Sequence, residues 1–177
     1  MIDDAMAGDR IIGMIQPWGG LSSQPILSPV GCAGRITSFN ETSDGRYLIT
    51  LTGVSRFRIT SELPVQTPYR QVRASFDPWE ADLTAPPAGE GALDREGLLD
   101  ALKAYLETRG LDIDWETAET APPEALVNSL AMALPFDPPE KQALLEAADL
   151  DRRAEVLTAL MQIGAAGDGE GETPSMQ

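Results

Sequence analysis

Two pairs of carboxylates are spaced closely enough to act together in acid–base catalysis or in binding a hard cation. Asp112 and Asp114 form one pair, and Asp149 and Asp151 form the other. A small carboxylate-dependent hydrolase would need two such acids to converge in an apolar pocket that separates their pKa values. The interpretation that we favour is plainer, because aspartates at such positions commonly cap helices or lie solvated in loops. The sequence therefore predicts no metal site.

The chain lacks the residue types on which most nucleophilic catalysis depends. It has no histidine, which excludes Ser-His-Asp and Cys-His systems and imidazole metal ligands. Its only lysines, Lys103 and Lys141, have acidic neighbours that keep an amine charged, and Cys32 has no base beside it. No glycine-rich phosphate loop is present. We therefore predict no catalytic residue and no cofactor, and expect the protein not to be an enzyme.

Charge is distributed unevenly along the chain of 177 residues. The formal net charge is −15, with 13 basic and 28 acidic residues. Residues 1–76 hold 6 acids and 7 bases, whereas residues 77–177 hold 22 acids and 6 bases. A negative field of this size repels phosphate backbones and anionic headgroups, so neither nucleic acid nor membrane is an expected partner. An acidic start, without an apolar run of about 18 residues, indicates a cytoplasmic protein.

The hydropathy pattern changes along the chain from a strand period to a helix period, which predicts an α+β fold. Residues 1–76 are expected to form a small curled sheet or open β-barrel. The prolines and glycines of residues 77–91 indicate a linker or long loop. Residues 92–164 are expected to form a helical bundle, and residues 165–177 a disordered acidic tail.

Strand patterns occur in four segments of the first part. They are residues 10–16, 31–40, 47–59 and 69–75. The first has apolar residues on both faces, as expected of a strand that is covered on two sides. The third alternates apolar and polar residues, and Gly53 in its middle is expected to permit a bend. Asp44 and Gly45 predict a hairpin turn before it.

Local start and stop signals predict four helices in the second part. Aspartate and threonine side chains supply caps, glycine supplies ends in the left-handed conformation, and proline stops a helix. The expected limits are Asp94 to Gly110, Thr120 to Pro135, a start at a capping box over residues 137–140, and Asp149 to Gly164. These short amphipathic segments can bury their apolar faces only against one another.

Pro17, Trp18 and Leu21 are our candidates for contact with a polypeptide partner. They surround two glycines in a segment that is expected to be a loop between two strands. A large aromatic side chain in such a loop can bind an apolar partner. For Trp18 itself we favour the other interpretation, in which it folds back as a lid over the barrel.

Four arginines of the β part admit two arrangements. They are Arg35, Arg46, Arg56 and Arg58. On the outer face of the sheet they would form a positive stripe that suits RNA. We favour the second arrangement, in which they pair with the acids of the helical part. Arginines covered in this way would argue against RNA binding.

Five segments carry a resemblance to a known family. They are Gly8–Pro17, Val30–Ile36, Gly45–Ile59, Val127–Ala131 and Pro135–Glu146. In their order and composition they resemble the N-terminal substrate-binding domain of Lon proteases, and the third segment is the most specific. The resemblance spans nearly all of residues 8–163.

The resemblance implies a pseudobarrel related to the PUA fold, followed by a helical bundle. It also implies a stand-alone, non-catalytic module that holds unfolded or partner polypeptide, with a protease as one candidate partner. Proteolysis and ATP hydrolysis are not carried over, because the ATPase and peptidase modules of Lon enzymes do not fit into 177 residues. PUA relatives bind RNA, so RNA binding is the alternative function, although the acidic charge disfavours it.

The chain departs from the family pattern at its start. Such domains usually begin with an additional strand and loop before the position that Met1 matches. We therefore expect a barrel that lacks its first strand and leaves a neighbouring strand with unpaired backbone groups. An edge of this kind favours dimerisation through the sheet, or aggregation.

Overall fold

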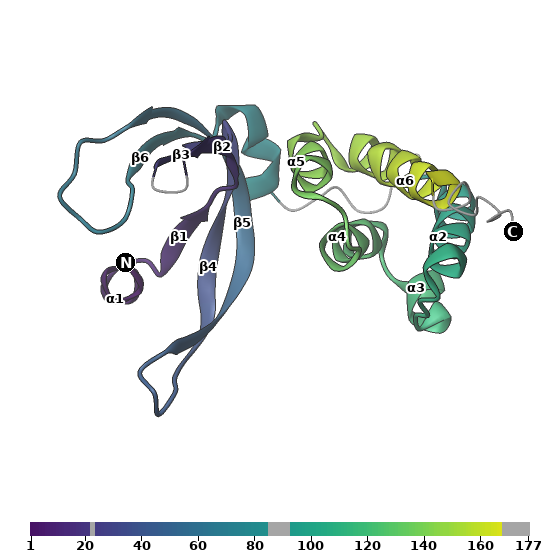
Figure 1. Cartoon of the computed structure of the whole chain (residues 1–177), viewed down its shortest axis with the longest axis horizontal. Coiled ribbons are helices and arrows are strands. Elements are labelled where there is room, and N and C mark those ends of the chain that lie inside the picture. The colour runs from purple at the N-terminus through teal and green to yellow at the C-terminus, as the bar shows by residue number, and fades with distance from the viewer. Residues whose placement is uncertain (22–23, 85–92, 168–177) are drawn as a thin grey trace, which may run out of the picture. The chain divides into compact units, whose positions relative to one another are not determined.

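The computed structural model describes residues 1–21, 24–84 and 93–167. The chain divides into two compact units, Met1–Ala88 and Gly89–Gln177. The first unit contains all the strands of the described chain, and the described residues of the second form only helices (Figure 1). The fold is therefore α+β, with open sheets first and helices second, as the sequence predicts.

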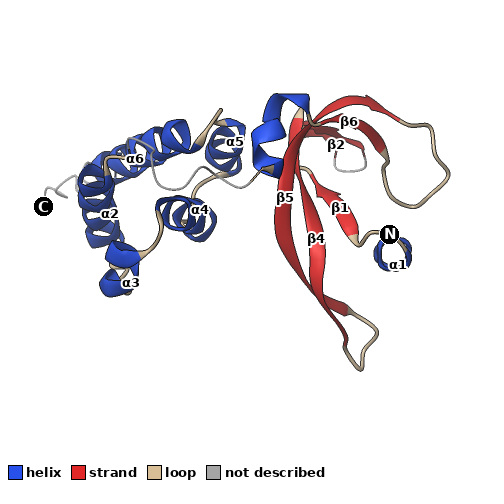
Figure 2. Cartoon of the chain, turned by 180° about the vertical axis from the view of Figure 1, so that it is seen from behind, coloured by secondary structure: helices blue, strands red, loops and turns tan. Residues whose placement is uncertain are grey.

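The first unit is built on an open antiparallel sheet with the strand order β1-β4-β5-β6. Its strands are β1 (Ile11–Met14), β4 (Val30–Glu41), β5 (Tyr47–Glu62) and β6 (Val72–Ser75). A second, two-stranded sheet pairs β2 (Pro17–Leu21) with β3 (Gln24–Leu27). Among the described residues, β1 and β6 each pair with a strand on one side only, so the sheet stays unclosed. Figure 2 shows the two short edge strands beside the long β4 and β5.

The turn between β4 and β5 lies where the sequence predicts it. Gly45 has a φ of +79°, a left-handed conformation that glycine adopts without a steric penalty. The N–H of Thr42 donates to the carbonyl of Arg46 at 2.8 Å and closes the hairpin. Both strands are longer than their sequence patterns, because the pairing continues from Val30 to Glu41 along β4.

A β-bulge interrupts this hairpin near its middle. Ala33 pairs with Ser55, but Gly34 pairs with Gly53, so Val54 is an extra residue on β5. A bulge increases the local twist and bends the strand that carries it. The bend that the sequence predicts at Gly53 coincides with this irregularity.

The prediction that residues 10–16 form a strand covered on both faces is wrong. Ile12 is the only buried residue of β1, whereas Ile11 and Met14 are exposed. The reason is position, because β1 is an edge strand of an open sheet. The final strand also begins later than expected, at Val72 instead of Tyr69. The apolar side chains of β1 therefore form exposed surface beside the unpaired edge of the sheet.

Residues 77–83, expected to belong to a linker, instead form the 3-10 helix η1 (Asp77–Leu83). Trp79 is buried, with the guanidinium carbons of Arg56 and Arg58 at 5.4 and 5.7 Å from its ring centroid. Asp82 accepts from Nε and Nη2 of Arg56, each at 2.8 Å. The prolines and glycines of segment 77–91 therefore did not reveal that its first residues form a packed helix. The boundary between the two units lies in the later part of this segment.

The second unit consists of five helices in the described chain. They are α2 (Arg95–Arg109), α3 (Trp115–Thr120), α4 (Pro123–Ala133), α5 (Pro138–Glu146) and α6 (Leu150–Gly167). Their buried apolar side chains form one cluster, centred on fully buried residues such as Leu102, Val127 and Leu157. The core of this unit is therefore built from its own helices.

The predicted helix caps are confirmed at three helices. Asp94 accepts from the N–H of Gly97 at 3.0 Å, and Gly110 ends α2 in the left-handed conformation. Asp137 forms a complete capping box with Glu140 at the start of α5. Asp149 accepts from the N–H of Arg152 at 2.8 Å in the first turn of α6. These signals are local, which is why the sequence reveals them.

Thr120 was expected to cap a helix but is the last residue of α3, a helix that the sequence analysis missed. The Thr120 hydroxyl donates back to the carbonyl of Glu116 at 2.8 Å. Asp114 is the N-cap of α3, where its carboxylate accepts hydrogen bonds from the hydroxyl and the N–H of Thr117. These hydrogen bonds lower the pKa of the Asp114 carboxyl below its usual value.

The end of the last helix also corrects a prediction, because α6 continues through Gly164 to Gly167. Residues 165–167 are therefore helical and do not belong to a disordered tail, while residues 168–177 lie outside the described residues. A Cβ on Gly164 would lie 2.6 Å from Cε2 of Tyr105 on α2. Gly164 therefore permits close packing of α6 on α2 and does not end the helix.

Candidate polypeptide-binding surface

The three residues predicted to contact polypeptide lie on strand β2 and not in a loop. Pro17, Trp18 and Leu21 are all exposed, Trp18 by 62% and Leu21 by 74%. The favoured interpretation of Trp18 as a lid over the barrel is wrong, because a lid would be covered. The pairing of β2 with β3 shifts between Pro17 and Gly19, so Trp18 is a bulged residue with no partner opposite it.

Strand β3 adds an apolar residue that the sequence analysis did not select. Ile26 pairs with Gly19 and is 61% exposed. We name the exposed side chains of Trp18, Leu21 and Ile26 the hairpin surface. Clusters of exposed large apolar side chains are uncommon on monomeric proteins and mark sites of association. The sequence analysis did not select Ile26, because the short segment Gln24, Pro25 and Ile26 gives no strong strand signal.

Two adjoining cavities in the first unit were not foreseen from the sequence. The first, which we name the sheet cleft, has a volume of about 460 Å³ and lies between β1 and β6. Its apolar lining includes Ile11, Ile15, Phe57, Ile59, Tyr69 and Val72. The second, the hairpin cleft, has about 680 Å³ and is lined by residues 24–29 with Ile59, Glu62 and Arg70. The two cavities share Leu27, Ile59 and Arg70 in their linings, so they lie next to each other.

Glycines form part of the wall between β1 and β4. A Cβ on Gly31 would lie 2.6 Å from Cδ1 of Ile15 and 2.8 Å from Cζ of Phe57, and a Cβ on Gly13 would lie 3.1 Å from the same Phe57 carbon. These side chains therefore approach the backbone more closely than any other residue type would permit. The missing side chains allow Ile15 and Phe57 to reach the lining of the sheet cleft.

Replacing Gly31 with alanine is expected to lower the free energy of unfolding of the first unit by about 2 kcal/mol, because the new methyl group overpacks this wall. The carbonyl of Met14, also 2.6 Å from the new Cβ, is backbone and cannot move aside without displacing β1. Urea unfolding measures the loss. Gly53→Ala is the control, since its Cβ would meet Cys32 Sγ at an ordinary 3.7 Å. Equal losses in both variants would contradict the argument.

Polar groups bound the clefts and hold a short helix beside them. Arg70 donates from Nε to Glu62 at 2.9 Å and from Nη1 to the carbonyl of Pro25 at 2.6 Å. Helix α1 (Ile2–Ala7) has no buried residue. Two phenols hold it, with Tyr47 donating to Asp3 at 2.9 Å and Tyr69 to Asp4 at 2.7 Å.

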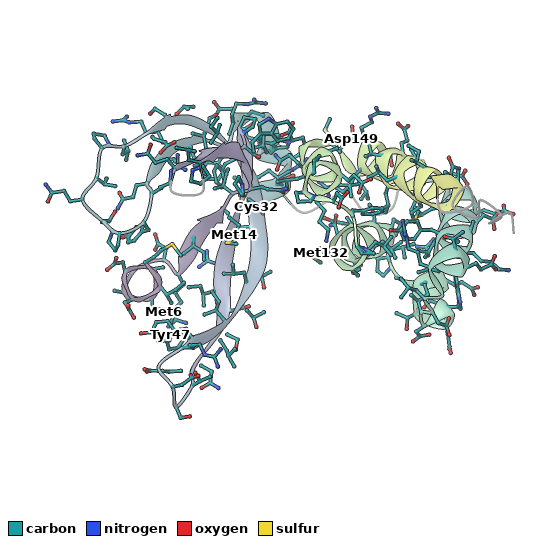
Figure 3. All side chains as sticks on the ribbon, viewed as in Figure 1. Met6, Met14, Cys32, Tyr47, Met132 and Asp149 are labelled. Carbon is teal, nitrogen blue, oxygen red and sulfur yellow. The ribbon has the colours of Figure 1, made fainter. Side chains whose placement is uncertain are left out.

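These tyrosine–aspartate pairs affect the titration of both phenols. The hydrogen bond to Asp3 raises the pKa of Tyr47, and the bond to Asp4 raises that of Tyr69. Phenols are protonated at neutral pH in any case, so both tyrosines can donate these hydrogen bonds there. Figure 3 shows Tyr47 next to α1, where Met6 is labelled.

Comparison with known families involves both units of the chain. The sequence model of the family described as the ATP-dependent protease La (LON) substrate-binding domain matches residues 1–162. The chain belongs to the Lon substrate-binding domain family. The resemblance found in the sequence is thus confirmed. A search of curated proteins finds no match.

Solved structures of Lon N-terminal domains share the fold. A Lon N-terminal domain protein from Xanthomonas campestris is 23% identical, with a TM-score of 0.60 over 89% of this chain and 80% of that one. The N-terminal domain of the Mycobacterium avium complex Lon protease is 18% identical, with a TM-score of 0.56 over 90% of this chain and 82% of that one. These similarities support the same arrangement of open sheets followed by helices.

The side chains that were considered as catalytic groups in this Lon substrate-binding domain lie in structural positions. Asp114 and Asp149 cap helices, as predicted, and Asp112 accepts from the N–H of Ile113 at 2.9 Å. Lys141 donates to the carbonyl of Met132 at 2.9 Å, and Cys32 is half-buried in β4. Within residues 1–21, 24–84 and 93–167, no cluster of three acids, cysteines or histidines could hold a metal ion. Nor does any helix of these residues have the length and apolar character to cross a membrane.

The four arginines of this Lon-type domain do not act as one group. Arg56 is buried and pairs with Asp82 of η1, one of the acids of residues 77–177. Arg46 pairs with its neighbour Asp44 at 2.7 Å in the hairpin turn. Arg35 donates to the carbonyl of Asp9 at 3.2 Å, and Arg58 lies over Trp79. The favoured pairing with the acids of the part that follows residue 76 is therefore confirmed for Arg56 and wrong for Arg46.

Proposed function

We propose that this Lon substrate-binding domain is a non-catalytic module that binds unfolded or partner polypeptides through its first unit. The observation that carries the proposal is the exposure of Trp18, Leu21 and Ile26 on one short hairpin. Strand β3 of the same hairpin lines both the hairpin cleft and, through Leu27, the sheet cleft. A partner could therefore bury apolar side chains on the hairpin surface and in the adjoining cavities.

The energetics of association favour this use of the hairpin surface. Burial of apolar area is the main favourable term, at about 25 cal/mol per Å². Tryptophan is among the residues that most often dominate binding energy. Unfolded polypeptides expose apolar side chains continuously, whereas folded proteins expose them only in patches. Such a surface therefore suits clients that have lost their fold.

The proposal also covers the partners of the protein and its location in the cell. The protein is proposed to act in the cytoplasm, with a protease as one candidate recipient of the bound polypeptide. Its net charge of −15 disfavours nucleic acid and anionic membranes. The unpaired edges of the open sheet would permit a homodimer, in competition with other polypeptides.

Replacing Trp18 with alanine is expected to weaken binding of an unfolded client at least tenfold, which corresponds to about 1.4 kcal/mol. The melting temperature should change little, because the side chain is exposed and bulged. Fluorescence anisotropy with a labelled, denatured protein measures the affinity. Met132→Ala is the matched control, since Met132 is a 72% exposed apolar residue of the second unit. It should bind like the unmodified protein.

The same titration tests the proposal as a whole. A labelled RNA is measured in parallel, at low and at moderate salt, because RNA binding weakens steeply with salt. Binding of RNA but not of denatured protein would overturn the proposal. Loss of about ten degrees in melting temperature with unchanged binding would show that Trp18 is structural. Hydrolysis of ATP or peptide that follows the protein through purification would contradict the non-catalytic role.

A further inference from the structure

Strand β1 presents unpaired backbone groups along its free edge. The N–H of Ile36 donates to the carbonyl of Arg10 at 2.7 Å, and the register continues with Ile12 opposite Gly34. In antiparallel pairs, every second residue exchanges hydrogen bonds with the neighbouring strand. The N–H and C=O groups of Ile11 and Gly13 therefore point away from β4. In the described part of the chain, no strand pairs with them.

The space beside this edge is the sheet cleft. Ile11 and Gly13 both line it, as do Phe57 and Val72 from the strands farther across the sheet. Ile11 and Gly13 are two residues apart, so their Cα–Cβ directions share one face of the sheet. The approach of Phe57 to Gly13 identifies that face as the one toward the cleft. An apolar cavity thus adjoins outward backbone donors and acceptors.

We propose that an extended polypeptide segment adds to β1 as an antiparallel strand. This inference rests on the proposed function and specifies how the client is held. The residues that exchange hydrogen bonds with Ile11 and Gly13 direct their side chains into the sheet cleft, because opposed residues share a face. The client residue opposite Gly13 contacts the ring of Phe57, since glycine leaves no side chain between them. The preferred client has apolar residues at alternate positions.

Charge adds a second preference to the client. Helix α1 carries Asp3 and Asp4 in its first turn, and Asp4 lines the sheet cleft, 3.7 Å from the N-terminal ammonium of Met1. Arg70, which also lines this cleft, is paired with Glu62. The carboxylates of Asp3, Asp4 and Glu62 outnumber these two cations, which favours a strand flanked by lysine or arginine. The proposed client is therefore a cationic, alternately apolar segment in extended conformation.

A set of labelled nine-residue peptides tests this binding mode. The parent has lysine at positions 1 and 9, leucine at positions 3, 5 and 7, and threonine at positions 2, 4, 6 and 8. N-methylation of the leucines removes the N–H groups that would bond to β1, and should weaken binding at least tenfold. N-methylation of the threonines should change the affinity less than threefold. A peptide with glutamate at both ends should bind at least fivefold more weakly than the parent at low salt.

Amide hydrogen exchange of the full chain gives a readout on the protein itself. With the parent peptide, the amides of Ile11 and Gly13 should become protected at least tenfold, while the amide of Ile12, already bonded within the sheet, should not change. Protection that rises with protein concentration in the absence of peptide would instead assign this edge to a second copy and overturn the proposal.

The two levels of inference fail in different ways. Equal loss of affinity with both N-methylated peptides, or the reverse order, would overturn strand addition at β1 even if denatured protein still bound. Absence of binding for every peptide and for denatured protein would overturn the proposed function. Gly13→Ala supplies a check on the contact with Phe57, because it should weaken the parent peptide while leaving the Trp18 surface unchanged.

Discussion

Replacing Asp82 with alanine is expected to lower the free energy of unfolding of the first unit by about 3 kcal/mol. The Asp82 carboxylate accepts hydrogen bonds from the N–H, Nε and Nη2 of Arg56. Arg56 is only 6% exposed, so water cannot readily replace this counter-charge. Urea unfolding in a Trp115→Phe background measures the effect, since the remaining tryptophans, Trp18 and Trp79, both belong to the first unit.

An exposed ion pair provides the control for this expectation. Glu155 accepts from Arg152 at 2.6 Å, and both side chains are well exposed to solvent. Glu155→Ala should cost less than about 1 kcal/mol, because solvent screens such pairs. The double variant Arg56→Met with Asp82→Leu should recover much of the loss, since apolar residues of similar volume avoid an uncompensated buried charge. A small loss for Asp82→Ala, equal to that of the control, would show that the pair is not stabilising.

Replacing Leu157 with alanine is expected to lower the free energy of unfolding of the second unit by about 3 kcal/mol. Leu157 is fully buried on α6 and belongs to the apolar cluster that includes Leu102 and Val127. The change removes apolar contacts and leaves a cavity that rigid helices fill only in part. Unfolding followed by Trp115 fluorescence reports this unit, because Trp115 packs against the same cluster.

The matched control for Leu157 lies on the same helix. Ile163→Ala removes a branched apolar side chain from an exposed position of α6 and should change stability by less than about 1 kcal/mol. Neither variant should alter client binding, because the proposed surface belongs to the first unit. If both variants lost the same stability, the cluster would not be the source of the unit's stability.

Features that depend on a few neighbouring residues could be predicted from the sequence. The turn at Gly45, the cap at Asp94 and the capping box at Asp137 each arise from local backbone geometry and side chains. Helix α3 was missed because its six residues, capped by Asp114, are too short to show a period. The end of α6 was misplaced because Gly164 serves packing against Tyr105, which sequence alone does not reveal.

The candidate site depends on contacts between distant segments, and the sequence analysis found only part of it. Trp18 and Leu21 were found because large apolar residues beside glycines stand out. The sheet cleft was not found, since its lining combines residues that are far apart in the sequence, such as Ile11 of β1 and Val72 of β6. Segment 77–91 was expected to be a linker because of its prolines and glycines, since the pairing of Asp82 with Arg56, 26 residues earlier, leaves no local signal. The burial of a strand likewise depends on its place in the sheet, as β1 shows.

The bulge at Trp18 bears on how the client preference of this domain can diverge during evolution. Residues in regular ladder positions are constrained by the side chain opposite, so a change in size disturbs a pair. Trp18 stands outside the ladder between Pro17 and Gly19 and has no such neighbour on β3. Its replacement by another side chain is expected to leave the register of the hairpin unchanged. Under the proposed function, this one position would therefore allow the choice of bound polypeptide to change during evolution largely independently of folding.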